Sequence, residues 1–161
     1  HMALGDALAV CLLEARGFTS DDFAKFHPGG SLGKQLYLKV ADIYPNNECP
    51  EVIIDSSIEE IILEITSKRL GATAVVDEKR NLKGIITDGD LRRMLTNKTT
   101  PTDVNAGSIM SPDPRTIDKD CYATQALALM QQNNITQLIV TDEEKVLGFV
   151  HLHDLLKEGI I

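Results

Sequence analysis

An internal repeat is the feature that most constrains how this chain can fold. When the sequence of 161 residues is shifted by 64 positions, residues 74–86 align with residues 138–150 without a gap. Two shorter stretches extend the match: residues 61–65 over 125–129, and, with one extra residue in the second copy, Ile54-Asp55 over Ile117-Asp118. Self-similarity at a fixed spacing predicts two copies of one structural unit.

Each copy predicts the same order of elements. A short apolar strand leads into an amphipathic helix (residues 58–68 and 122–133), then a buried strand, a polar turn and a second strand ending near Thr87 or His151, followed by a closing helix. The fold class is therefore α+β, with two β-α-β-β-α units. One unit of about 60 residues buries little apolar surface alone. We expect the two copies to pack face to face, pseudo-symmetrically, around a shared core.

The residues before the repeat have a different character. Leu4, Leu8 and Leu12 follow helical spacing, and Gly17 ends that run. A second short helix is predicted from the Thr19-x-x-Asp22 cap to the glycines after Pro28. Between the copies, residues 96–103 are polar, rich in threonine and interrupted by proline, as in a linker. We expect three parts: a helical segment over 3–33, a first unit over 34–99 and a second over 100–161.

Charge and composition exclude several classes of partner. A net charge of −8, a pI near 4.9 and no long basic run argue against binding to nucleic acid or to an anionic membrane surface. No apolar stretch approaches the ~18–20 residues that span a bilayer, and we expect a cytoplasmic protein. The three cysteines are far apart and form no C-x-x-C pair, which favours reduced thiols over disulfides or zinc.

The strongest candidate for a ligand motif is residues 84–91, GIITDGDL. Thr87 and Asp90 are three positions apart at a strand-to-helix junction, which predicts a capping box. In that box the Thr87 side chain accepts a helix amide and Asp90 accepts from the Thr87 amide. Free amides at a helix start also favour an anion, and a carboxylate can accept from both hydroxyls of a ribose. The pattern admits both the structural and the ligand-binding role.

Two arginines, Arg92 and Arg93, follow on the same helix. They can form an ordinary solvated face, or one guanidinium can pair with a ligand phosphate one turn from the candidate anion site.

The second copy departs from the motif, because His151 stands where the first copy has threonine. A neutral imidazole can still cap the helix or bond a ligand hydroxyl, and Asp154 keeps its capping role. On a continuing strand His151 and His153 would point to opposite faces, which is poor geometry for a shared metal, so we expect no metal site. The two sites should differ, with the first the better nucleoside site.

The duplicated unit resembles a CBS pair (cystathionine β-synthase domains, or Bateman module) over residues ~38–161, with residues 84–91 similar to that family's ligand motif. The resemblance implies that Asp90 grips a ribose, that Thr87 contacts phosphate or ribose, and that the base lies between apolar strands. Upstream, three stretches resemble the end of a sugar-isomerase (SIS) domain: residues 5–10, 15–18 and 26–34. This order is similar to that of the arabinose-5-phosphate isomerase family, whose members interconvert ribulose 5-phosphate and arabinose 5-phosphate for Kdo, a sugar of lipopolysaccharide and capsule.

Several expectations follow from this second resemblance. His27 would be one active-site residue of the parent enzyme, or else a surface histidine. The other catalytic groups would lie upstream, so we expect the present chain to be catalytically inert and to require no cofactor. The implied function is regulatory: the pair binds CMP-Kdo, or AMP or ATP, and biases its own SIS domain. The alternative is a structural platform that joins a homodimer and has no ligand. Apolar helix positions can then be core or interface: Leu91, Met94, Leu95, Leu155 and Leu156.

Overall fold

A computed structural model of the chain describes residues 2–19, 22, 31–96 and 104–160. Ahead of the repeats lie helices α1 (Met2–Ala15) and α3 (Ser31–Tyr37) and two short 3-10 turns, η1 (Val40–Asp42) and η2 (Tyr44–Asn46). The first repeat contains β1 (Glu51–Ile53), α4 (Ile58–Lys68), β2 (Ala72–Val76), β3 (Leu82–Thr87) and α5 (Asp88–Thr96). Next come α6 (Ala106–Ile109), β4 (Ser111–Pro112), β5 (Thr116–Asp118), α7 (Ala123–Asn133), β6 (Gln137–Asp142), β7 (Lys145–His151) and α8 (Leu152–Lys157).

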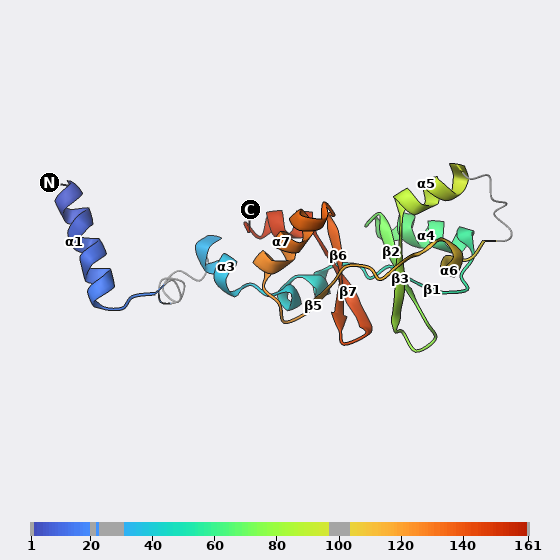
Figure 1. Cartoon of the computed structure of the whole chain (residues 1–161), viewed down its shortest axis with the longest axis horizontal. Helices are drawn as coiled ribbons and strands as arrows, with labels where there is room; N and C mark the ends of the chain where they lie inside the picture. The colour runs from blue at the N-terminus through green and yellow to red at the C-terminus, as the bar shows by residue number, and fades with distance from the viewer. Residues whose placement is uncertain (1, 20–21, 23–30, 97–103, 161) are drawn as a thin grey trace.

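The predicted β-α-β-β-α order is confirmed in both repeats, which lie side by side in Figure 1. In the first, β1 pairs parallel with β2 and β2 antiparallel with β3; β5, β6 and β7 repeat this arrangement in the second. A helix covers each sheet because its apolar residues recur at helical spacing. The buried side chains of α4 are Ile58, Ile61 and Ile65, and those of α7 are Ala123, Ala126 and Met130.

Strand register shows that the offsets assigned to the first part of each repeat, 63 at the first strand and 64 in the helix and the strand after it, were wrong. Val52 lies opposite Val75, and Ile117 lies opposite Val140, so these residues correspond at an offset of 65. Val75 also faces Gly84 and Val140 faces Gly148, which restores the offset of 64 in β3 and β7. The turn between β2 and β3 is therefore one residue longer than its counterpart. Runs of similar aliphatic letters align almost equally well one position apart, so the sequence alone could not place this gap.

The segment that precedes each repeat in the chain packs against the other repeat. The Val40 and Ala41 amides donate to the carbonyls of Cys121 and Lys119, both at 2.9 Å. In the same way, the Ala106 amide donates to the Ser56 carbonyl at 2.9 Å. Val40 is fully buried in the core of the second repeat, and Ala106 is fully buried in that of the first. The two repeats thus exchange their leading segments, residues 38–47 and 104–112.

A third hydrophobic cluster joins the two sheets. Its buried members come from both repeats: Ala72, Ala74, Val76, Ile139, Val146 and Phe149. A backbone hydrogen bond of 2.9 Å from the Leu82 amide to the Glu144 carbonyl also links the two hairpins. The expected shared core is therefore present, and its buried residues come from β2 of the first repeat and from β6 and β7 of the second.

Helix α1 lies apart from the repeats (Figure 1), and its apolar side chains are exposed, with Leu4 75% and Leu8 61% accessible. The predicted stop at Gly17 is confirmed, since this residue has a φ of 60°. The predicted Thr19 cap is present, with the Asp22 amide donating to Thr19 Oγ1 at 3.2 Å. The rest of the second predicted short helix, with His27 and residues 28–30, and most of the predicted linker (97–103) lie outside the described residues. Within the described ranges, every helix is too short or too polar to cross a bilayer.

Candidate functional site

The candidate ligand motif lies where β3 ends and α5 begins, and its centre is the buried carboxylate of Asp90. Oδ2 of Asp90 accepts from the Thr87 amide at 2.8 Å, which confirms the predicted reach back to that amide. The Thr87 hydroxyl, however, donates to the same oxygen at 2.6 Å instead of accepting from a helix amide. A buried carboxylate is the strongest acceptor within reach, so it takes the hydroxyl proton.

The other carboxylate oxygen of Asp90 is also occupied. Oδ1 accepts from the Arg93 guanidinium and from Ser111 Oγ, the latter at 3.3 Å. Burial alone raises the pKa of the Asp90 carboxyl, but the hydrogen bonds from Thr87 and Arg93 outweigh it and hold this pKa below its usual value. Asp90 is therefore ionised at neutral pH. Arg93 is bound to Asp90 and Arg92 is exposed.

Beside this junction is a cavity of about 260 Å³ between the two repeats. The first repeat contributes Ile85 and Thr87. The second contributes Arg115 and the turn from α7 to β6: Asn134, Ile135, Thr136 and Gln137. Thr87 thus lines the cavity while Asp90 holds Thr87 in place from behind. The structure brings Thr87, Asp90 and Arg93 together on one junction.

Sequence reasoning missed Arg115 and residues 134–137. Asn134 ends α7 in the left-handed conformation with a φ of 53°, and Arg115 Nε donates to Asn133 Oδ1 at 3.1 Å. The sequence signal that could have indicated them is their position, since Arg115 directly precedes β5 and residues 134–137 lead into β6. Only the packing of one repeat on the other puts them beside Thr87.

His151 and Asp154, the second motif pair, lie at the start of α8 and do not line this cavity, although His151 pairs with Gln137 across the second hairpin. Asp154 Oδ2 accepts from the His151 amide at 2.9 Å, and His151 Nδ1 accepts from the His153 amide at 3.1 Å, so both residues cap the helix as expected. Asn47, from the exchanged segment, donates to Asp154 Oδ2 at 2.8 Å.

His151 and His153 would face opposite ways only on a continuing strand, and the strand does not continue past His151. Because α8 already begins at Leu152, the two rings stack, with centroids 5.0 Å apart and planes 20° apart. Burial, and then the neighbouring His153, lowers the pKa of His151, so its imidazole is neutral at pH 7. In the part of the chain that the structure describes, no three His, Cys, Asp or Glu side chains are grouped so as to hold a metal ion.

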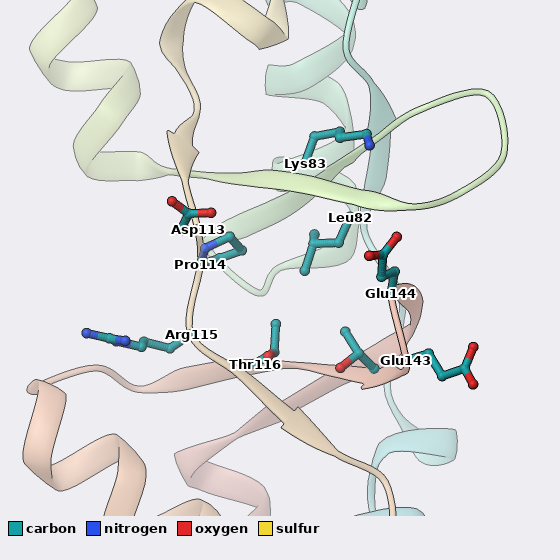
Figure 2. Close-up of a pocket in the computed structure, with 9 residues that line it drawn as sticks. Leu82, Lys83, Asp113, Pro114, Arg115, Thr116, Glu143 and Glu144 are labelled. Atoms are coloured by element: carbon teal, nitrogen blue, oxygen red, sulfur yellow. The ribbon is translucent and has the colours of Figure 1, made fainter.

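A second hollow, of about 450 Å³, lies between the start of β3, the connecting segment 113–116 and the tip of the second hairpin (Figure 2). Its charged lining is mixed: Lys83, Asp113, Arg115, Glu143 and Glu144. Figure 2 shows Arg115 extending from the connecting segment to the side opposite Glu143 and Glu144. Arg115 is thus available to the cavity beside Thr87, and the hollow offers an anionic ligand no uniform cationic surface.

Comparison with solved structures places the fold. The chain superposes on the crystal structure of CBSX2 in complex with AMP with a TM-score of 0.62 at 21% identity, covering 74% of this chain and 94% of that one. It also superposes on the CBS domain pair of MJ0100, in complex with 5′-methylthioadenosine and S-adenosyl-L-methionine, with a TM-score of 0.63 at 27% identity, covering 75% and 94%. The fold is that of a tandem CBS pair.

Curated relatives are more similar in sequence. The chain is 44% identical to arabinose 5-phosphate isomerase KdsD of Salmonella typhi over 161 residues, which is 99% of this chain and 49% of that protein. It therefore spans about half the length of the curated relatives it matches. The sequence model of the CBS domain matches residues 40–97 and again residues 106–160. The chain belongs to the CBS domain family and carries two CBS domains in tandem.

Proposed function

We propose that this CBS pair binds a nucleotide or nucleotide-sugar in the cavity beside Thr87 and acts as a regulatory module. The observation that carries the proposal is that both repeats line this cavity. A ligand there contacts both repeats at once, so its binding can favour one arrangement of the pair over another.

The lining suits the parts of a nucleotide. Ile85 and Ile135, from opposite repeats, offer apolar surfaces to a base, and Asn134 and Gln137 offer amide groups to its polar edge. Arg115 supplies the locally placed positive charge that an anion needs on a chain of net charge −8. The ligands named for the two solved CBS structures, AMP, 5′-methylthioadenosine and S-adenosyl-L-methionine, all contain adenosine and support this class of ligand.

Asp90 is proposed as the group that receives the ribose. Its carboxylate already accepts from Thr87, Arg93 and Ser111. Ribose hydroxyls would replace one or more of these donors, which leaves the carboxylate satisfied in both states. Arg92 is exposed and can turn toward the ligand phosphate, and Arg93 can do so when its contact with Asp90 is the one that the ribose replaces.

Isothermal titration calorimetry with AMP, ATP, CMP and CMP-Kdo tests the proposal. We expect binding of at least one ligand, and a loss of about 10- to 150-fold in affinity for Arg115→Ala, because a hydrogen bond to a charged group contributes roughly 1.5–3 kcal/mol. Lys83→Ala, in the neighbouring hollow, is the matched control and should leave affinity unchanged. Absence of heat with all four ligands would reject ligand sensing.

The parent enzyme is proposed from the curated relatives. With an isomerase half upstream, His27 would join its active site, and the CBS pair would bias the conversion of ribulose 5-phosphate to arabinose 5-phosphate in the cytoplasm. CMP-Kdo, as the activated product of Kdo synthesis for lipopolysaccharide or capsule, is the feedback candidate. Activity of the full-length enzyme with and without CMP-Kdo tests this step, whereas this chain alone should show no turnover.

Exposed apolar residues support the second candidate, a platform that joins two copies. Met94 and Leu155 are buried in the cores and Leu91 packs against one, whereas Leu95 and Leu156 stay 69% and 46% accessible. The apolar positions of each of these two helices thus lie partly in the core and partly on the exposed surface. Sedimentation analysis of Leu95→Glu separates the candidates: loss of a dimer with ligand binding intact supports the platform.

A further inference from the structure

The two repeats form two pseudo-equivalent clefts, and strand pairing shows which residues correspond. Thr87 faces Ala72 across the first hairpin, and His151 faces Gln137 across the second. One cleft lies where Thr87 meets the second repeat near Gln137. Its counterpart lies where His151 meets the first repeat near Ala72. By the same correspondence, Phe149 replaces Ile85.

The first of these clefts is open. Gln137 and Thr87 are both partly accessible and line the 260 Å³ cavity together with Ile85. Because the positions facing the cavity carry a hydroxyl, an amide and a guanidinium, a polar ligand finds hydrogen-bonding partners there.

The counterpart positions are filled with packed apolar side chains. Phe149 and Ala72 are both fully buried in the cluster between the repeats, and Leu70 and Cys49 pack against that cluster. A larger ring stands where the open cleft has Ile85, and a methyl group stands where it has the Gln137 amide. Burial of this surface stabilises the contact between the repeats, and these packed apolar side chains fill the space and offer a ligand no hydrogen-bonding group.

The polar groups of the second motif are also tied to the protein. The Asn47 amide donates to both Asp154 Oδ2 and the Phe149 carbonyl, at 2.8 and 3.0 Å. His151 Nδ1 is engaged by the His153 amide. The exchanged segment, which packs on the second repeat, thus holds Asp154 and the Phe149 backbone in place.

We propose that each chain binds one ligand, in the cleft of Thr87 and Gln137, and that the cleft of His151 and Ala72 is a closed packing joint. The identity of the ligand rests on the proposed function; the difference between the clefts does not. A ligand then acts on one side of the pair only, while the opposite side holds the repeats together.

A thiol-labelling experiment tests this difference without any ligand. In the full chain with Cys11→Ser, Cys49→Ala and Cys121→Ser, single thiols are introduced by Gln137→Cys or by the equivalent Ala72→Cys. Each reaction rate with DTNB is divided by the rate of the same variant unfolded in urea, and circular dichroism verifies folding. We expect the normalised rate of Gln137→Cys to be at least ~10-fold higher than that of Ala72→Cys, since a thiol must be accessible to react with DTNB. Equal normalised rates would overturn the closed joint.

Calorimetric stoichiometry is the second readout, with the ligand that binds most tightly among AMP, ATP, CMP and CMP-Kdo. We expect one binding site per chain. Binding should be lost in Gln137→Ala and retained in Leu70→Ala. Two sites per chain, or loss of binding only in Leu70→Ala, would overturn the assignment. If none of the four binds, the proposed function fails, and the thiol rates still decide whether the clefts differ.

Discussion

Two glycines in β3 and β7 allow the exchanged segments to pack closely, and adding a methyl group to each should separate rigid from adaptable contacts. A Cβ on Gly148 would lie 2.8 Å from Tyr44 Cδ2, with the next atoms at 3.6 and 3.7 Å, also in Tyr44. A Cβ on Gly84 would lie 2.7 Å from Met110 Sδ and 2.9 Å from the Ser111 carbonyl oxygen. The obstacle at Gly148 is one side chain, whereas at Gly84 it includes backbone.

The expected costs follow from that contrast. Carbon atoms pack best at about 3.5–4.0 Å, and overpacking a well-filled site costs about 1–3 kcal/mol. The Tyr44 ring can tilt by the needed ångström, so Gly148→Ala should cost about 1 kcal/mol. Gly84→Ala must displace β4, which pairs with β3 at Gly84 and Ile85, and should cost about 2–3 kcal/mol.

Thermal and urea unfolding followed by circular dichroism measure these costs, at about 2–4 °C in Tm for each kcal/mol in a chain of this size. Tyr44→Ala should remove most of the penalty of Gly148→Ala in a double-mutant cycle, whereas Met110→Ala should relieve Gly84→Ala only in part. Gly5→Ala is the control, because nothing lies within 4 Å of its added Cβ. If both strand variants unfold within ~0.5 kcal/mol of wild type, the reciprocal packing is wrong.

Three further predictions concern caps and charged groups. Asp90→Asn should destabilise the chain by about 1.5–3 kcal/mol at pH 7, because the buried Asp90 carboxylate accepts four charge-assisted hydrogen bonds. Since the Asp90 pKa is lowered on folding, the difference in unfolding free energy between the wild type and the variant, measured in urea titrations, should shrink as the pH falls below ~4. The His151 pKa is also lowered, so the folded state disfavours the charged imidazole, and the free energy of unfolding should fall as the pH drops from 7.5 through ~6.5. His151→Asn keeps a cap acceptor and should show a smaller fall. Parallel stability-versus-pH curves for the wild type and this variant would contradict the prediction. Ser57→Ala removes a cap whose Oγ accepts from the Glu60 amide at 3.3 Å and should cost about 1 kcal/mol, whereas Ser67→Ala, at the other end of α4, should cost less.

Local patterns were enough to predict much of the fold and part of the candidate site. The helix over residues 58–68 was predicted to the residue from its apolar spacing, and the structure shows that the Ser57 cap and the left-handed Arg69, which bound it, are also local features. The Asp90 contact with the Thr87 amide was predictable for the same reason, since it spans only three residues. The order of elements in both repeats follows from the same local signals.

Contacts between distant residues were not predictable from the sequence. A short leading segment has the same local preferences whichever repeat it packs against, so the exchange of residues 38–47 and 104–112 appears only in the tertiary structure. The lining of the cavity by Thr87 and Gln137, 50 positions apart, depends on that packing.

The sequence by itself determined that there are two similar units and where each polar motif stands in its unit. The tertiary structure decided which motif faces a cavity: side chains such as Phe149 and Ala72 close one cleft because they meet residues from the other repeat. Volume and burial at such a joint belong to both surfaces together, and neither stretch of sequence specifies them alone.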